Sequence, residues 1–577
     1  MSNYTVKQAA LSRTPCSLVV ITVDKCSLTY GVGDCTATAA DKCYNTFPTC
    51  RDRANYDRTT QDLKFTTHEA PLPFKAGERP YVSKIGYLPT EIKTSLSVRG
   101  RATVDMVDEP DGDVGIDPYL TDRTTVPAAS YWKKFLARNG NFKGRPLKIY
   151  DGFIGLTESD FTTEGKRFNG IIDNVKIGKG TVQISAVDIL AQLNDVSIPE
   201  KLNVKLAVAL DAVAVSATLS GEDVASLDSP SGYVRIGDEI ILYEAIDTTT
   251  KIISDITRGS FNTTAEAHSE GAKVQQCRYY AADNPFDMMQ TILTDGGVDV
   301  GDVDADAFAA AKGFDNDQDV ESVISEPIKA GALFFELVSL MCCKAWVSED
   351  LKITIARILP NHPDTVPTAI TDDLNIIDES PNVDLNQTSL VTRCSIYWQK
   401  NPVGSDTEIL SYDRLNVAVD TDAEGASEYN AVSEKTIYSR WLHSTLGNEE
   451  EYFLWVASLA ARLVWPFRNP MPLIDFEVEI KDSAILTGGV VLLSTDELCD
   501  RYGDDLENAA FQVVKRHKKD QKIILTCLRL TPNRILYIAP DDAPDYDDAT
   551  TAEREKYGYI SDANGLMSDG AEGYVIY

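Results

Sequence analysis

The sequence predicts a multidomain, mainly β protein with a smaller α/β domain. Three observations lead to this class. The chain has 577 residues, which is too long for one core and predicts roughly three to five domains. Many short runs rich in Val, Ile, Thr and Tyr are bounded by Gly, Asp and Pro, as strands and turns are. The apolar and charged fractions, 43% and 25%, are those of a globular protein.

The order of the patterns divides the chain into six expected segments. They are an N-terminal strand with a Cys-rich metal-binding module (1–75), a first β domain (76–205), an inserted small β domain (206–280), a mixed α/β domain (281–380), a second β domain (381–535) and an extended tail (536–577). The two larger β domains share an outline of strands with one interrupting helix, which suggests a diverged duplication.

Five segments predict helices, and two of them, residues 283–297 and 303–314, lie in the mixed α/β domain. Residues 132–140 have a short helical pattern that ends at a glycine, and residues 449–465 interrupt the second β domain. Residues 331–346 are the most apolar stretch, but Glu336 interrupts it and it is too short to span a bilayer. We therefore expect a buried helix there.

The charge of the chain makes some classes of binding partner unfavourable. The formal net charge is −33, which disfavours binding to nucleic-acid phosphates or anionic membranes. The first sixteen residues have no apolar core like that of a secretory signal. We expect folding in a reducing cytoplasm, where clustered cysteines indicate a metal site more than disulfides.

Four of the eleven cysteines crowd into one short polar stretch near the N-terminus. Cys26, Cys35, Cys43 and Cys50 follow the spacing C-x8-C-x7-C-x6-C. Structural zinc sites use at least one close pair, which is missing here, whereas iron–sulfur ligands can come from spaced loop positions. An iron–sulfur cluster is the favoured interpretation, with zinc and unligated thiols as the alternatives. Cys16 and the cysteines beyond residue 50 have the pattern of packed core thiols.

Catalytic signatures are absent from the sequence. None of the five histidines lies in a hydrolase motif, and no phosphate-binding loop or dinucleotide fingerprint occurs. His268 has no partner in the sequence that would make it a general base, so a structural role is the better interpretation. We expect no enzymatic activity.

Three stretches carry a family likeness. All three resemble the baseplate or tail-tip hub proteins of long-tailed phages and gene transfer agents. They are the cysteine segment CSLTYGVGDCTA…KCYNTFPTC, the insert YVRIGDEIILYEA…ITRGSFNTTAEAHSEGAKV and the end APDYDDATTAEREKYGYISDANGLMSDGAEGYVI. These hubs are similar to the T4-type baseplate hub.

The resemblance implies a structural virion protein at the distal end of the tail, made in the host cytoplasm. It implies two tube-like β-barrel domains per chain and a homotrimer with pseudo-sixfold symmetry, which suits closed symmetry. Implied partners are a distal tail protein and tail-tube proteins above, and a central fibre or receptor-binding tail-tip protein below. The role would include host attachment and DNA ejection, without sequence-specific nucleic-acid binding.

The cysteine segment also resembles that of the phage λ tail-tip protein, which carries a four-iron cluster. The gaps within its first and last cysteine pairs match those of Cys26/Cys35 and Cys43/Cys50, although its central gap is longer and its segment is C-terminal. The resemblance thus implies that these four residues bind a 4Fe–4S cluster, with zinc as the alternative. The cluster would crosslink a loop-rich module that has little apolar core.

Two other functions remain open on the sequence. The chain could be a tail-associated cell-wall hydrolase, although it lacks a recognisable nucleophile and base. It could also be a receptor-binding tail-tip module, with the insert at 222–276 as the contact surface.

Overall fold

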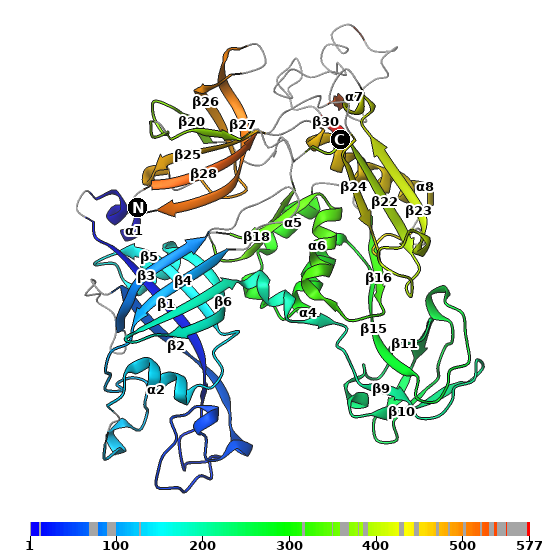
Figure 1. Ribbon diagram of the computed structural model, residues 1–577, viewed down its shortest axis with the longest axis horizontal. Coiled ribbons are helices and arrows are strands. Elements are labelled where there is room, and N and C mark those ends of the chain that lie inside the picture. Colours follow the sequence, from blue (N-terminus) through cyan, green and yellow to red (C-terminus); the bar gives the residue numbers. More distant parts are fainter. Residues whose placement is uncertain are drawn as a thin grey trace.

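The computed structural model is mainly β and contains several separate sheets, with helices gathered in its middle part (Figure 1). It describes residues 2–10, 13–67, 79–88, 100–125, 128–313, 318–348, 350–357, 368–378, 380–384, 390–425, 432–443, 449–468, 472–482, 485–499, 503–519, 522–529, 536–538, 550 and 574–576. Within these ranges no helix has the length and apolar character needed to cross a membrane.

The N-terminal part closes into a seven-stranded barrel. The strand order is β1-β2-β3-β4-β7-β6-β5. The strands are β1 (Pro15–Cys26), β2 (Arg58–Thr67), β3 (Arg79–Leu88), β4 (Arg101–Val107), β5 (Pro146–Phe153), β6 (Lys166–Ile177) and β7 (Thr181–Asp188). Strand β1 closes the barrel by pairing antiparallel with both β2 and β5. Alternate side chains such as Val19, Val104 and Ile184 fill the interior.

The helix expected at 132–140 is present as α2 (Tyr131–Arg138), which lies beyond one end of the barrel (Figure 1). Its Trp132 is fully buried and stacks on Phe65 of β2 with 5.2 Å between ring centroids. Two further short helices, α1 (Asn3–Ala9) and α3 (Glu158–Glu164), lie against the outside of β5. The barrel is therefore packed on its inside and on part of its outside.

The expected boundary at residue 75 does not separate two structural units. Strands β1 and β2 precede it, yet they belong to the same barrel as β3–β7. Without them β5 and β3 would be open sheet edges. The sequence shows where strands occur, but hydrogen-bonding partners far along the chain decide which strands form one sheet. Residues 68–78, around this boundary, lie outside the described residues.

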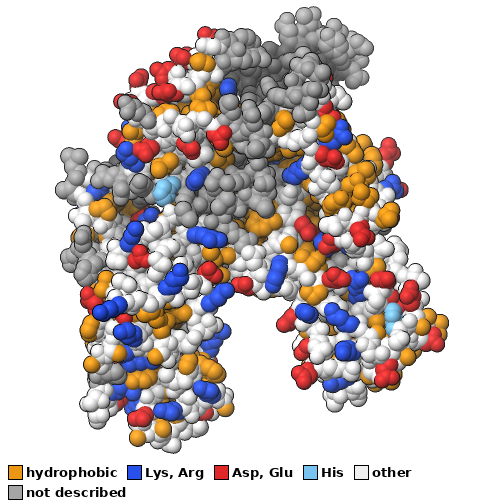
Figure 2. Space-filling model, viewed as in Figure 1, with side chains coloured by type: hydrophobic (Ala, Val, Ile, Leu, Met, Phe, Trp, Pro, Cys, Tyr) orange, Lys and Arg blue, Asp and Glu red, His pale blue; other side chains and the backbone are white. Residues whose placement is uncertain are grey.

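A small β domain lies where the insert is expected, at one end of the molecule (Figure 1). Its strands are β9 (Val204–Leu206), β10 (Ser216–Gly221), β11 (Gly232–Ile236), β12 (Glu239–Tyr243), β13 (Ala245–Asp247), β14 (Ile252–Ser254) and β15 (Lys273–Asp283). They enclose a hydrophobic core of their own. Figure 2 shows that this domain and the barrel project as two lobes with a hollow between them.

The middle of the molecule is a mixed α/β region. Its elements are α4 (Pro285–Asp295), α5 (Ala305–Gly313), α6 (Ala330–Leu340), β16 (Val320–Ile324), the pair β8 (Ser197–Ile198) and β17 (Ile328–Lys329), and the hairpin β18 (Cys343–Val347) and β19 (Ile353–Arg357). Strand β16 pairs with β15 and so continues the sheet of the small domain.

The helix expected at 331–346 is shorter in the structure. Helix α6 ends at Leu340, the chain turns at Cys342, where φ is 55°, and the following residues form β18. A short run that is apolar on all sides carries no period that separates a buried helix from a buried strand. The pairing of β18 with β19 decides its conformation.

The second β domain expected at 381–535 is divided between two bodies. The sheet of β22 (Arg393–Lys400), β23 (Tyr412–Val419) and β24 (Glu434–Tyr438), followed by α8 (Glu449–Val464), shares one core with the mixed region. Trp398, Trp441 and Tyr452 belong to that core. Helix α8 agrees with the helix expected at 449–465, and the short helix α7 (Thr421–Glu424) follows β23.

The other body is a six-stranded sheet in the order β20-β26-β27-β28-β25-β21. Its strands are β20 (Thr368–Thr371), β21 (Asn382–Asp384), β25 (Leu473–Glu479), β26 (Val490–Cys499), β27 (Asp505–Lys519) and β28 (Lys522–Arg529). In the part of the chain that is described, this sheet is open, whereas a second barrel was expected. Strand β20 also precedes the expected boundary at residue 380 and joins the sheet by parallel pairing with β26.

Most of the expected tail, 536–577, lies outside the described residues. Its described strands, β29 (Leu536–Ile538) and β30 (Tyr574–Ile576), pair antiparallel.

A buried carboxylate connects several segments of the small domain by hydrogen bonds. The side chain of Glu239 is fully buried and accepts hydrogen bonds from Arg258 at 2.7 Å, from the backbone N–H of Gly259 at 3.0 Å and from that of Glu266 at 3.2 Å. The Nε2 of His268 lies 2.8 Å from it. Burial raises the pKa of Glu239, but these hydrogen bonds outweigh burial and lower the pKa to about 2. His268 therefore has a structural partner, in agreement with its expected role.

This arrangement predicts loss of stability in acid. The pKa of Glu239 is lower in the folded protein than its ordinary value of 4.5. Its contribution to the stability of the fold is therefore complete above that pH and disappears as the pH falls toward about 2.

Glu239→Gln leaves Arg258 buried without its carboxylate and should destabilise the small domain by about 3 kcal/mol at neutral pH. Hydrogen–deuterium exchange of peptides from 204–283, corrected for intrinsic rates, measures both effects. The control is Glu270→Gln, an exposed carboxylate in the same domain. Equal protection in the two variants would contradict the prediction.

Candidate metal centre

The four cysteines of the candidate site lie on and beyond the end of strand β1. Cys26 is the last residue of β1 and pairs with Arg58, the first residue of β2. The loop of residues 27–57 is thus inserted between two neighbouring barrel strands. Its middle is brought back to the barrel by a hydrogen bond of 2.7 Å from the N–H of Cys26 to the carbonyl of Asn45. The first ligand position is therefore held by the barrel itself.

Tight turns shape the loop around the cysteines, as the sequence predicts. Gly31 and Gly33 have φ angles of 67° and 61°, a region that favours glycine. A 3₁₀ turn over Phe47–Thr49 leads into Cys50. The N–H of Asp52 then donates a hydrogen bond to Cys50 Sγ, with 3.4 Å between nitrogen and sulfur. A backbone amide that points at a sulfur stabilises a thiolate there.

The four thiols differ in exposure, and burial dominates at Cys43. Cys26 and Cys43 are buried, and Cys35 and Cys50 are half-buried. Burial is the main cause of the raised pKa of the Cys43 thiol, and charge on Cys50, Cys35 and Cys26 raises it further, while a backbone hydrogen bond at Asn45 lowers it. Cys35 and Cys43 thus share one small hydrophobic cluster, and the charges of Cys26, Cys35 and Cys50 act on the Cys43 thiol.

All four cysteines are described, and they do not form a preformed site for a single ion. Within the described residues, which include all four cysteines, no three His, Cys, Asp or Glu side chains are placed to hold one metal ion. A tetrahedral zinc ion with Zn–S bonds of about 2.3 Å requires sulfur atoms roughly 3.8 Å apart. An iron–sulfur cluster binds each thiolate through a different iron and so accepts a wider set of ligands.

The module has little apolar core of its own. Its buried hydrophobic residues are Tyr30, Ala37, Cys43 and Tyr119, and Cys35 packs against them. Tyr119, which is contributed by a segment after β4, accepts a hydrogen bond of 2.6 Å at its hydroxyl from the N–H of Tyr30. So small a core stabilises a loop of this length weakly, and crosslinking through the thiols would supply what it lacks.

Two arginines outside the module hold its second half. The guanidinium groups of Arg123 and Arg138 each lie 3.8 Å from the ring centroid of Tyr44. Arg123 also donates hydrogen bonds to the carbonyls of Lys42 and Cys43, at 3.1 and 3.0 Å. These cations stabilise the aromatic ring by cation–π contact and add positive charge beside the thiols.

Two buried carboxylates hold these arginines in turn. Asp117 forms an ion pair with Arg123, and Asp113 forms one with Arg138 at 2.9 Å. Neither arginine was singled out from the sequence, because both are far along the chain from the cysteines and lie in no motif.

The other cysteines are separate from this site. All eleven cysteines lie in described residues, and none forms a disulfide. Cys16, Cys277, Cys343, Cys394 and Cys527 are buried, as expected for packed thiols, whereas Cys342 is half-buried and Cys499 is exposed. Only the last two depart from the expected role.

Comparisons with known proteins give similar structures but no sequence match. No protein-family model and no curated protein matches the chain. A tail protein from Neisseria meningitidis MC58 is similar, with 10% identity and a TM-score of 0.37 over 78% of this chain and 92% of that one. The 43 kDa tail protein of prophage MuSo2 from Shewanella oneidensis has 10% identity and a TM-score of 0.36 over 78% and 94%. A chain of a native gene transfer agent virion has 9% identity and a TM-score of 0.29 over 78% and 85%.

Proposed function

We propose that this chain is a non-enzymatic structural protein of a phage or gene-transfer-agent tail, and that it forms the hub at the distal end of the tail tube. The observation that supports this proposal best is the closed barrel β1–β7 beside a second, largely antiparallel sheet of the same chain. The stacked rings of Tyr87 and His517, with centroids 6.1 Å apart, connect the two bodies. Two β bodies per chain suit a hub in which three chains continue a sixfold tube.

The charge of the chain suits a passage for DNA. A net charge of −33 repels nucleic-acid phosphates, so DNA would move past such a protein without binding to it. In this proposal the hub contacts a distal tail protein and tube proteins above, and a central fibre or receptor-binding tail-tip protein below. It takes part in host attachment and DNA ejection through these contacts.

The cysteine module would hold a 4Fe–4S cluster bound by Cys26, Cys35, Cys43 and Cys50. The charges of the other three cysteines that act on Cys43, the amide directed at Cys50 and Arg123 beside Cys43 support this assignment. When bound, the cluster supplies a rigid crosslink between the end of β1 and two turns of the loop. Cys26, Cys35, Cys43 and Cys50 would hold it, and the contacts of Tyr44 and Thr46 with Arg138 would keep its loop against α2.

Receptor binding by the small domain is a second candidate function. Tyr233, Phe261 and Tyr279 form a half-buried aromatic cluster on this domain, with ring centroids 4.8 to 5.7 Å apart. Such rings suit contact with a partner surface. A hydrolase has less support. Among the described histidines, His268 and His443 hydrogen-bond to Glu239 and to the Arg440 carbonyl, and His517 stacks on Tyr87.

The first prediction of this proposed function concerns the location of the chain in the particle. Gold-labelled antibody against this chain should mark only the distal end of the tail in electron micrographs of intact particles. Particles of a mutant that lacks the protein serve as the control. Label along the tail or on the capsid, or none on the particles, would contradict the hub proposal.

The second prediction concerns oligomeric state. The purified protein should assemble as a trimer, since three chains with two β bodies each match a sixfold tube. Native mass spectrometry measures the mass of the assembly, which should be three times the chain mass of 63.4 kDa. A stable monomer or hexamer would contradict the trimer.

The third prediction concerns the metal centre. Protein purified without oxygen should contain about four iron and four acid-labile sulfide per chain. Cys43→Ser and Cys50→Ser should each lose both, because a hydroxyl replaces a thiolate ligand. Cys499→Ser, which removes an exposed thiol elsewhere, should retain both. Stoichiometric zinc without iron in the unaltered protein would refute the cluster.

A further inference from the structure

The charge of the protein is divided unevenly along its length. Residues 1–200, which include the barrel, contain 25 Lys and Arg and 24 Asp and Glu, whereas residues 201–577 contain 30 and 64. The second part therefore carries the whole net charge of −33. Two copies of the chain repel each other where their second parts meet, and a contact between the barrel of one copy and the acidic part of the next avoids this repulsion.

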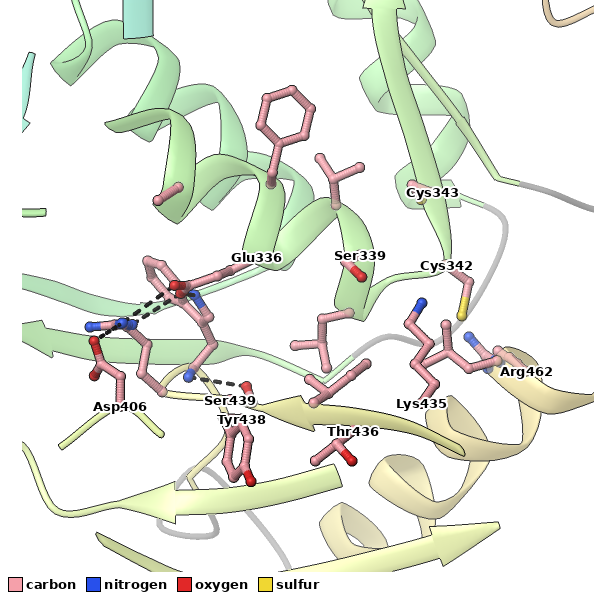
Figure 3. A pocket seen from close by; sticks show the side chains of 18 of the residues that line it. Glu336, Ser339, Cys342, Cys343, Asp406, Lys435, Thr436, Tyr438, Ser439 and Arg462 are labelled. Carbon is pink, nitrogen blue, oxygen red and sulfur yellow. Dashed lines mark hydrogen bonds and ion pairs between the residues drawn. The ribbon is translucent and has the colours of Figure 1, made fainter. Parts of the chain in front are cut away.

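The sheet β22–β24 in the acidic part has one covered face and one open face. Its covered face packs against α6 and α8 beside a cavity of about 540 Å³. Figure 3 shows that the side chain of Lys435 leaves β24 on this side, whereas those of Thr436 and Tyr438 leave it on the other. The register places Tyr438 beside Tyr397 of β22, and Tyr397 beside Leu415 of β23. The open face therefore continues from β24 across β22 to β23.

Exposed apolar side chains gather at β23, the outer strand of this sheet. Alternate residues on its open face are 41% to 50% exposed, and two residues in the first turns of α8 are 41% and 62% exposed. The two groups are neighbours, because Asn416 of β23 donates a hydrogen bond to the carbonyl of Phe453 at 3.3 Å. Figure 2 shows hydrophobic side chains on the surface over these elements. The five residues, called the β23 patch below, are Leu415, Val417, Val419, Phe453 and Leu454.

Strand β23 is also the edge of its sheet. Among the described strands it pairs only with β22, so its other side has no strand partner there. Natural proteins usually protect such an edge with charged residues, proline or a bulge. The stretch LNVAV at 415–419 has no charged residue and no proline, and its register with β22 is continuous. A bare apolar edge of this kind invites aggregation unless another surface covers it.

Carboxylates lie around the β23 patch. Asp413 is on the same face of β23, and Asp422 follows the end of that strand. Glu434 of β24 lies in the same row of the sheet as Val419, and Glu451 lies in the first turn of α8. All four carboxylates are exposed, and none of them has an ion pair among the residues that the structure describes. The rim of the patch is therefore negative.

The outer wall of the barrel has the opposite charge. The register sets Lys84 of β3 beside Asp105 of β4, and Lys176 of β6 beside Gln183 of β7. Asp105 accepts a hydrogen bond from Gln183 at 2.8 Å. The exposed cations of this wall have no ion pair within the described ranges, and one exposed apolar residue lies among them. These residues, called the barrel wall below, are Lys84, Arg101, Lys176, Lys179 and Ile177.

We propose that the β23 patch of one copy binds the barrel wall of a second copy of this chain, and that this contact joins the chains of the trimer. An apolar centre with a rim of charges that oppose those of the partner is typical of protein–protein contacts. Two different surfaces meet in this contact, so its repetition can close into a ring. The inference rests on the trimer of the proposed function.

Sedimentation velocity of the full-length protein over a range of concentrations tests the patch. Val417→Glu should weaken assembly about tenfold or more, because it places an unpaired carboxylate inside an apolar contact. Val213→Glu, at a valine of the small domain that is 82% exposed, is the matched control and should assemble like the unaltered protein. A trimer that Val417→Glu leaves intact would overturn this contact and leave the hub proposal standing. An unaltered protein that stays monomeric would contradict the trimer itself, and this contact with it.

An exchange of charges tests which two surfaces meet. Asp413→Lys with Glu434→Lys on the patch should weaken the trimer about tenfold at low salt, and so should Lys84→Glu with Lys176→Glu on the wall. At about 500 mM salt both effects should be smaller, because ions screen the charges. All four substitutions in one chain again place opposite charges across the contact and should restore most of the assembly. A fourfold variant that assembles no better than the two double variants would overturn the pairing of these surfaces.

The control for these charge changes is Lys205→Glu with Lys273→Glu, at two exposed lysines on neighbouring strands of the small domain. It should leave the trimer unchanged.

The unaltered protein provides a further test that needs no variant. Hydrogen–deuterium exchange is measured above and below the concentration at which the protein assembles. Peptides that cover 412–419 and 174–185 should lose protection on dilution, because their backbones leave a contact, whereas peptides from 204–221 of the small domain should not change. Exchange at 412–419 and 174–185 that does not depend on assembly would overturn the proposal.

Discussion

Strand β1 is the element on which the rest of the structure depends. Its residues 18–21 are buried on both faces, which is unusual in a barrel strand. Val19 and Ile21 face the barrel core, whereas Leu18 and Val20 belong to an outer cluster that includes Leu351 of the middle region. The same strand hydrogen-bonds to β2 and β5 and so closes the barrel. One strand thus joins the barrel interior, its outer helices and the neighbouring body.

The candidate metal centre is an extension of that strand. Cys26 ends β1, so the position of the first thiol is set by the hydrogen-bonded ladder with β2 rather than by the loop. The remaining thiols lie on a loop whose small core is completed from outside by Tyr119 and by the arginines around Tyr44. A rigid strand and buried ion pairs therefore hold a segment that could not fold on its own apolar residues.

The middle region combines parts of the chain that the sequence separates. Helix α6 and the sheet β22–β24 with α8 share one hydrophobic core, and the cavity lies on their common boundary. At one end of the cavity, Arg440 forms ion pairs with Glu336 at 3.0 Å and with Asp406 at 2.7 Å.

Local patterns in the sequence determined the class of structure and singled out four thiols as candidate ligands. Alternating residues predict the strands of the barrel, the helical period predicts α2 and α8, and four cysteines in one short polar stretch predict a metal site there. These features depend on neighbours in the chain, which is why they are visible in a single sequence.

Tertiary structure alone decided the rest. Three outcomes depend on partners far along the chain. They are whether residues 343–347 continue a helix or pair as β18, whether β1 belongs to a separate module or closes the barrel, and whether β22 joins β25 or α6. The same holds for Arg123 and Arg138 beside the thiols. Hydrogen-bond pairing and charge proximity are properties of positions in space, and no local pattern of residues encodes them.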